Sequence, residues 1–424
     1  MIAVSTMRWA LLVVLVAIVV IAGVIATRAI SPTRVSSADI DLDFTALQRE
    51  RAESFRRRVR RAGLVSTALA VLVPVVLVCS GVVRRFVEVL HVPWWVQVAA
   101  VCTLLAAVGL VITLPSALVI RRACLKTGLA TGPWSRWWRD LFLGSAIGWL
   151  ITTGAMLGWI AVARWSPDYW WLIVAPAFAA AVVLASFVLP VVIEPLFSRF
   201  TSLAHGPLRS DLLALADRDR VPVRDVLVAD ASRRTSALNA YVSGLGPTRR
   251  IVVHDTLLDR DRPAEVRAVV AHELGHVVAH DVGLGTILAA LSSAAGVVAA
   301  AVLLSWPWLL GLGQVSGADD PAVAGLILAL GGVAGVLGAP VQSAASRRIE
   351  RRADEHALEL TADPATIAQM HRSLALTNLS ALQPPVLLQW WFGTHPTSPE
   401  RISRARAWAV ERGLPAPPAL ASAD

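Results

Sequence analysis

Two histidines and a glutamate stand at a spacing that suits a metal-dependent hydrolase. His272 and His276 are four residues apart in the stretch Ala-His-Glu-Leu-Gly-His. Residues four apart on a helix share one face, so both imidazoles can reach a single cation. Glu273 follows the first histidine and can point its carboxylate at a water on that cation. This is the His-Glu-x-x-His pattern of zinc hydrolases, in which the metal acidifies water and the glutamate accepts its proton.

The surrounding residues predict the helix that this pattern needs. Apolar residues recur at helical spacing through the stretch: Val266, Val269, Val270, Leu274, Val277 and Val278. His280 lies eight residues after His272, which is roughly 12 Å along a continuous helix, so the two cannot share one ion. A catalytic zinc takes three protein ligands and keeps one position open, so the third ligand is expected from another segment.

A second polar segment, Ser346-Arg-Arg-Ile-Glu-Arg-Arg-Ala-Asp, offers candidates for that ligand. Glu350 can be the third ligand, and Asp354, one helical turn on, can accept the free N–H of a histidine ligand. The alternative interpretation is a solvated charged helix with ion pairs between successive turns. Farther on, His395 and Arg401 are two donors that could steady a tetrahedral oxyanion or a substrate carbonyl.

The composition predicts that these residues lie beside a membrane. Of 424 residues, 56% are hydrophobic and 16% charged, and the mean hydropathy is +0.62. Seven apolar runs are long enough to span a bilayer, near residues 9–27, 62–82, 97–119, 142–163, 170–192, 285–309 and 321–343. The first run could instead be a signal peptide, but its apolar core is long and it lacks a small-residue cleavage site.

Arginine and lysine in the loops predict the orientation of these spans. Nine arginines lie between spans one and two, and five arginines or lysines between spans three and four. The opposite loops carry far fewer, which places the N-terminus outside and the segments 193–284 and 344–424 in the cytoplasm. Because the net charge of +9 comes from arginines flanking spans, we expect the lipid bilayer as partner and no nucleic acid. The preference for Ala, Val and Arg over Lys indicates a bacterial plasma membrane protein.

The predicted fold class is mainly α, a polytopic helical membrane protein with about seven spans and a small α+β metallopeptidase part. The expected division is 1–192, a membrane region with five spans; 193–284, the first half of the metallopeptidase domain; 285–343, two further spans; 344–413, its second half; and 414–424, a disordered Pro/Ala-rich tail. Within the first half we expect a helix near Leu208 to Arg218 and strands near Asp225 to Asp230, Asn239 to Val242 and Arg250 to His254.

Six separated motifs together resemble one known family. They are Ile193-Glu-Pro-Leu-Phe-Ser-Arg-Phe, Asn239-Ala-Tyr-Val with Gly244-Leu-Gly, Asp255-Thr-Leu-Leu, His272-Glu-Leu-Gly-His, Ser346-Arg-Arg-Ile-Glu-Arg-Arg-Ala-Asp, and His395-Pro with Arg401-Ile. From about Ile193 to Ala407 the chain is similar to the type I CAAX prenyl endopeptidases, the seven-span membrane zinc metallopeptidases of the gluzincin type. Motifs in this order are far more specific than one alone.

The resemblance implies a function for each motif. It implies one zinc ion per chain with the ligands His272, His276 and Glu350, and Glu273 as general base. His395 and Arg401 would assist at the scissile carbonyl. The strand that contains Asn239, Ala240 and Tyr241 would pair with an extended polypeptide substrate through main-chain hydrogen bonds.

The predicted function is a zinc-dependent integral-membrane endopeptidase that hydrolyses peptide bonds of membrane-associated or extended polypeptides. A heat-shock-type membrane quality-control protease is an alternative, since it has a similar zinc site but usually fewer spans. From another class, the chain could be a transporter or receptor with a structural zinc site. Against this, Glu273 would have no purpose in a closed site, and the spans are almost free of ionisable residues.

Overall fold

The computed structural model of the chain describes residues 35–421 except 245 and 261. Six helices in this part are long and apolar enough to cross a membrane. They are α3 (Ala46–Cys79), α5 (Trp94–Thr127), α6 (Trp134–Trp165), α7 with its continuation (Trp170–Phe197), α12 (Asp281–Leu303) and α14 (Val323–Thr361). Each overlaps one of the predicted spans, although α3, α12 and α14 leave out the last or first few residues of theirs. The remaining span, 9–27, lies outside the described residues. The mainly α, polytopic fold is confirmed.

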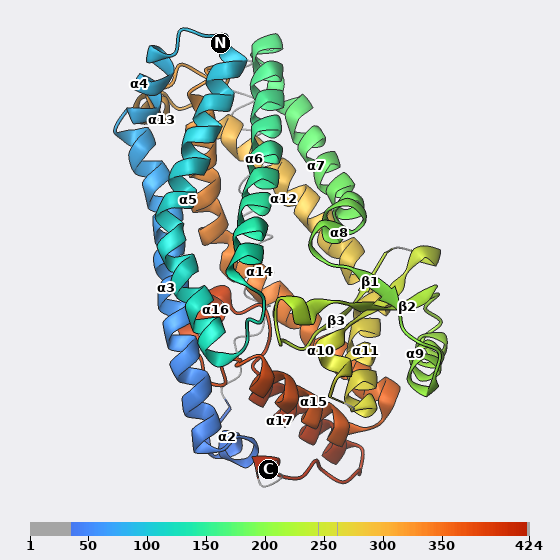
Figure 1. Cartoon of the computed structure of the whole chain (residues 1–424). Helices are drawn as coiled ribbons and strands as arrows, with labels where there is room; N and C mark the ends of the chain where they lie inside the picture. Colours follow the sequence, from blue (N-terminus) through green and yellow to red (C-terminus); the bar gives the residue numbers. More distant parts are fainter. Residues whose placement is uncertain (1–34, 245, 261, 422–424) are drawn as a thin grey trace.

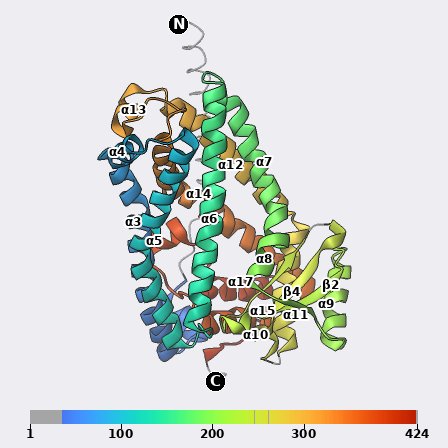
Figure 2. The same cartoon turned by 45° about the horizontal axis from the view of Figure 1, so that its top comes forward.

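The long helices gather in one half of the molecule and the small elements in the other. In Figure 1 the six long helices fill the upper part, with α3 continuing to the bottom of the molecule. The sheet with α9 (Pro207–Arg218), α11 (Pro263–Val278), α15 (Pro364–Thr377) and α17 (Ser398–Glu411) lies in the lower part. Figure 2 shows the same division after rotation. The shorter helices are α2 (Ser37–Asp43), α4 (Val82–Val89), α8 (Glu194–Phe197), α10 (Asp255–Leu258), α13 (Pro307–Gly313) and α16 (Val386–Phe392).

α14 joins the two halves because its 39 residues form one helix. At 1.5 Å per residue it is roughly 58 Å long, about twice the thickness of a bilayer core. Pro340 lies inside it and cannot donate a hydrogen bond to the carbonyl of Val336. The indole Nε1 of Trp391, from α16, donates to that carbonyl at 2.8 Å instead. The contact compensates for the missing bond and fixes α16 against α14.

The sheet has four strands in the order β1-β2-β4-β3. β1 (Phe200–Ser202) and β3 (Ala240–Ser243) form its edges, antiparallel to their neighbours, while β2 (Asp225–Ala229) and β4 (Arg250–His254) pair in parallel. The three predicted strands and the helix at 207–218 are all present. The short strand β1 was not predicted from the sequence.

The core of the lower half draws on segments far apart in the chain. Val270 and Leu274 of α11 are fully buried and pack with Ile251 of β4 and Ile402 of α17. Ile40 of α2 also belongs to this core, as does Phe44 directly after α2. The predicted division assigned residues 37–44 to the membrane region, 1–192. Ile40 and Phe44 instead pack in the core of the lower half.

The Pro/Ala-rich tail differs from the disorder expected of it. As far as Ala421 it has no regular helix, yet Leu420 is 6% exposed and belongs to the same core as α11. Arg406 donates hydrogen bonds to the carbonyls of Pro417 and Pro418. Residues 414–421 therefore pack on the protein, and 422–424 lie outside the described residues.

Candidate metal centre and active site

His272, His276 and Glu350 converge between α11 and α14. Their ligand atoms all lie within 4.8 Å of one another. The Nε2 atoms of the histidines are 3.3 Å apart, and the Glu350 carboxylate oxygens lie 3.4 Å from His272 Nε2 and 3.7 Å from His276 Nε2. Ligands about 2.0–2.1 Å from one ion in tetrahedral directions are about 3.3 Å apart. The residues present therefore fit a tetrahedral metal ion.

The electrostatics of this group also favour a cation. His272 is 8% exposed, and burial alone would lower its pKa. Hydrogen bonds with the carboxylates of Asp354 and Glu350 outweigh burial and raise the pKa of His272 to about 9. The negative field that holds a proton on this imidazole would equally favour a metal ion bound to it.

Each histidine is braced by a carboxylate on its other ring nitrogen. Asp354 Oδ1 lies 3.0 Å from His272 Nδ1, as the sequence predicted for this aspartate. Asp281 Oδ2 lies 2.9 Å from His276 Nδ1, and its other oxygen is hydrogen-bonded by Arg352 of α14. Such bonds fix the ring and leave Nε2 free to bind a metal. The sequence did not assign this role to Asp281.

Asp281 reaches His276 because the helix breaks between α11 and α12. The sequence predicted one continuous helix through His280, but α11 ends at Val278. His280 has a φ of 56°, in the left-handed region, and α12 starts at Asp281. This turn brings Asp281 back beside His276. His280 itself is exposed and is not one of the three residues that converge, although the predicted reason for excluding it was wrong.

Glu273 is half-buried on α11 beside the two histidines. Burial is the main cause that raises the pKa of this carboxyl above its usual value. The nearby charges of His272 and His276 act in the opposite direction. Its place next to the convergent ligands is that of a carboxylate able to accept a proton from water.

His395 and Arg401 both lie next to the three converging residues, but their contacts differ. His395 precedes α17, its side chain is 60% exposed, and its Nδ1 lies 2.9 Å from Glu350 Oε2. Arg401 is bound to Asp354 through two nitrogens, with Nε 2.8 Å from Oδ2. Its Nη2 lies 3.6 Å from Glu350 Oε2. The guanidinium thus holds Asp354 in place, and His395 is the more accessible donor.

His371 of α15 is a neighbour that the sequence did not reveal. It is 2% exposed, with Nε2 at 3.4 Å from Asp354 Oδ1. Burial is the main cause that lowers its pKa to about 4, so the ring is neutral near pH 7. A single histidine in a mixed helix gives no signal of such a place, because only the packing of α15 beside α11 and α14 creates it.

The predicted substrate strand is at the free edge of the sheet. Within the described residues, β3 pairs only with β4. His254 N–H donates to the Asn239 carbonyl, and antiparallel residues alternate between bonded and non-bonded pairs. The backbone groups of Ala240 and Val242 therefore face the free edge, whereas those of Asn239 and Tyr241 face β4.

The side chains near β3 anchor it to the preceding motif. The Tyr241 hydroxyl donates a hydrogen bond to Glu194 of α8. Burial and this carboxylate raise the pKa of Tyr241 well above its usual value, so the hydroxyl keeps its proton. Asn239 is exposed. Of the three predicted residues, only Ala240 thus presents its backbone to a partner strand.

A polytopic helical protein with this His-His-Glu group on two facing helices has the features of an integral-membrane metallopeptidase. Comparisons with known proteins agree. Residues 202–409 match peptidase family M48, and residues 38–199 match the family described as the CAAX prenyl protease N-terminal part with five membrane helices. The chain belongs to the CAAX prenyl protease family of M48 peptidases.

Individual relatives support this assignment. Over 341 residues the chain is 31% identical to the "Uncharacterized metalloprotease YhfN" of Bacillus subtilis, with 78% of this chain and 79% of the relative aligned. It is 40% identical to CAAX prenyl protease 1 of Saccharomyces cerevisiae over 114 residues, 27% of this chain and 25% of that protein. The crystal structure of S. mikatae Ste24p has the same fold, with a TM-score of 0.77, 20% identity and 94% and 98% of the two chains covered. The predicted membrane metalloendopeptidase is confirmed.

Proposed function

We propose that this chain is a zinc-dependent endopeptidase of a bacterial plasma membrane that binds one zinc ion. Its substrates would be membrane-associated or extended polypeptides. The convergence of His272, His276 and Glu350 carries the proposal: one ligand atom from each lies within 4.8 Å of the others, and the nearest atom pairs are 3.3 to 3.7 Å apart, close to the spacing around a tetrahedral ion. Glu273, adjacent in the same helix, supplies the base that a purely structural site would not need.

The protein's own groups then divide the reaction among them. A bound zinc ion would supply Lewis acidity and make water more acidic. Glu273 takes the proton from the attacking water and delivers it to the amine that leaves. Asp354 and Asp281 keep the two imidazoles oriented, which supports the geometry throughout the reaction.

His395 is proposed to donate to the substrate carbonyl as negative charge develops on its oxygen. Its exposed side chain beside Glu350 supports this role. Arg401 has its guanidinium committed to Asp354. We propose that Arg401 acts mainly through that carboxylate, with its Nη2 adding positive charge near the site.

We propose that the substrate adds a strand to the free edge of β3. The backbone groups of Ala240 and Val242 face that edge, and α11, which carries the two histidine ligands, packs against β3. Main-chain pairing demands an extended substrate but no particular sequence, and side-chain pockets would provide the preference.

Replacing Val242 by proline tests whether the substrate pairs with the free edge of β3. The substitution removes an N–H that faces the edge and leaves the ladder to β4 intact, because proline is tolerated on edge strands. We expect kcat/KM for an extended peptide to fall about tenfold, as for the loss of one good hydrogen bond, with metal content unchanged. Val242→Ala removes the same side chain but keeps the N–H, and should cost much less. Equal losses in both variants would count against strand addition.

Metal removal tests the proposed function as a whole. The purified full-length protein should cleave an internally quenched, extended peptide. We expect 1,10-phenanthroline to abolish cleavage and a stoichiometric amount of Zn²⁺ to restore it, while Mg²⁺ should not, because imidazole ligands favour zinc over magnesium. Cleavage that continues after complete removal of metal would refute the proposal.

The orientation and division of the chain are part of the same proposal. Segments 193–284 and 344–413 would form one metallopeptidase domain at the cytoplasmic face, with 1–192 and 285–343 in the membrane. The arginine-rich segment before residue 62 supports this side. A reporter fused after Asp424 should be cytoplasmic, and one inserted in segment 311–320 external. Finding both reporters on the same side of the membrane would contradict this topology.

A further inference from the structure

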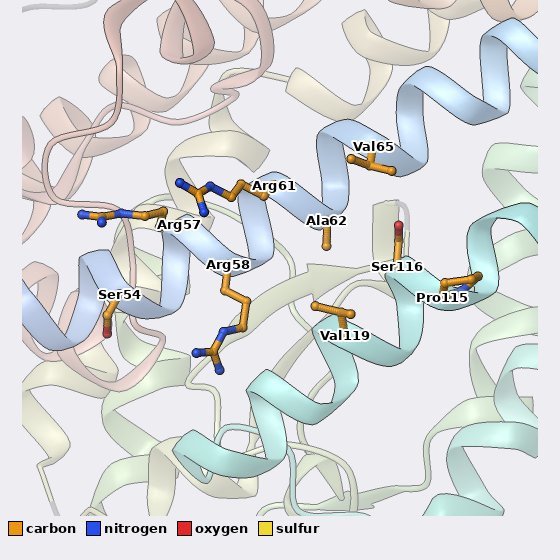
Figure 3. A pocket seen from close by; sticks show the side chains of 9 residues that line it. All are labelled: Ser54, Arg57, Arg58, Arg61, Ala62, Val65, Pro115, Ser116 and Val119. Atoms are coloured by element: carbon orange, nitrogen blue, oxygen red, sulfur yellow. The ribbon is translucent and has the colours of Figure 1, made fainter.

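A groove with basic and apolar walls lies between α3 and α5, away from the residues of the metal site. Its volume is about 450 Å³, within the usual range for small-molecule sites, roughly 300–1,000 Å³. Figure 3 shows Arg58 reaching from α3 toward α5, and Ser116 and Val119 of α5 opposite Ala62 of α3. The short side chains of Ala62 and Ser116 leave room between the two helices.

The basic side of the groove has fewer carboxylates than arginines among the described residues. Arg58 and Arg61 are exposed, and neither has a carboxylate within 4.0 Å among the residues that the structure describes. Arg57, also in the lining, is 3.7 Å from Glu53, whose oxygen lies closer, at 3.1 Å, to Arg60. One glutamate therefore serves two arginines, and the groove keeps a net positive charge that attracts an anion.

The other side of the groove is apolar and belongs to the membrane-spanning part. Val65 is 54% and Val119 40% exposed. The apolar run of α3 starts at residue 62 and that of α5 ends at residue 119. Because α3 and α5 run in opposite directions, the start of the apolar run in α3 and its end in α5 lie at the same level, beside this groove. It therefore lies where the hydrocarbon ends and the headgroups begin, at the same end of the spans as the metal site.

We propose that this groove binds an anionic phospholipid from the adjacent leaflet. Arg58 and Arg61 would hold the phosphate mainly through their positive charge. An acyl chain would lie along Val65 and Val119. A soluble phosphate would use only the basic half, and a nucleic acid or acidic peptide would meet apolar side chains at the depth of the bilayer.

Lipid titration of the full-length protein in a nonionic detergent tests the proposal. The probes are dioctanoyl phosphatidylglycerol, dioctanoyl phosphatidylcholine and glycerol 3-phosphate. We expect the first to bind at least tenfold more tightly than the other two. An arginine near an anionic headgroup contributes about 1 kcal/mol, which is about fivefold in affinity. Arg58→Gln with Arg61→Gln should therefore weaken phosphatidylglycerol about 25-fold, if the two contributions add.

Two matched double variants distinguish binding in this groove from a general attraction of anionic lipid to the positive end of the spans. Arg122→Gln with Lys126→Gln also removes two positive charges, from the end of α5 near the groove but outside its lining, and should change affinity less than twofold. Arg58→Lys with Arg61→Lys keeps the charge and should retain most of the binding. This pair keeps the proposal testable if the glutamine pair does not fold. Equal affinity for phosphatidylcholine, or equal losses in both glutamine pairs, would overturn the proposal. Equal affinity for glycerol 3-phosphate would mean a soluble phosphate ligand and also refute it.

Discussion

Replacing Glu273 by glutamine is expected to lower the rate of peptide hydrolysis by about 10²- to 10⁴-fold, the usual contribution of a positioned acid–base group. The amide cannot take the proton of the attacking water, while the three convergent ligands remain. The variant should therefore keep about one metal ion per chain. Single-turnover cleavage of a quenched peptide and metal analysis of the same preparation measure both quantities.

A control on an exposed glutamate makes this result specific. The Glu359 side chain of α14 is 63% exposed and lies 3.8 Å from Arg412, so Glu359→Gln should leave the rate unchanged. The raised pKa of Glu273 adds a second signature. Because a carboxyl with a raised pKa gains its proton at a higher pH, the rate should fall on acidification earlier than for an ordinary glutamate. Undiminished activity in Glu273→Gln would refute the proposed mechanism.

Removing the Glu350 carboxylate should cost most of the bound metal and the activity together. In Glu350→Ala only the two imidazoles would remain, since these three residues form the convergent group. Asp354→Asn keeps all three ligands and loses the carboxylate that orients His272, so metal affinity should fall about 10- to 100-fold. Metal analysis after dialysis against a graded series of chelator concentrations distinguishes the two.

His280→Ala is the matched histidine control in that series. His280 lies outside the convergent group, beyond the break after Val278, and the metal content should stay near one per chain. Metal retained in Glu350→Ala but lost in His280→Ala would show that the third ligand has been assigned wrongly.

The sequence was sufficient to predict elements that depend on local pattern. The pair His272 and His276 shares a helix face because the spacing of four residues dictates it, and the apolar runs fix the spans by their length. Glu350 and Asp354 were expected on one helix face for the same reason. Their approach to α11 is a tertiary contact, which the sequence suggested through the order of motifs and the return of the chain after two spans.

Other features depend on contacts that no local pattern encodes. The left-handed turn at His280 places Asp281 beside His276, but the residues of the stretch are those of an ordinary helix. His371 reaches Asp354 only through the packing of α15. Ile40 and Phe44 join the core of the lower half from before the first described long helix, and Leu420 does so from the far end of the chain. For Ile40, Phe44 and Leu420, burial in a shared core decided the position.

The unbroken length of α14 gives the two halves of the metal site different mechanical connections to the bilayer. Glu350 lies 27 residues beyond Val323, roughly 40 Å along a rigid rod, so one degree of tilt at the membrane end displaces it by roughly 0.7 Å. His272 and His276 stand on α11, which is a separate helix from α12, and α12 reaches the imidazoles across the turn at His280 and through Asp281 at His276 Nδ1. Hydrophobic thickness, which sets helix tilt, therefore acts on the carboxylate ligand along one continuous helix and on the imidazoles only across a turn.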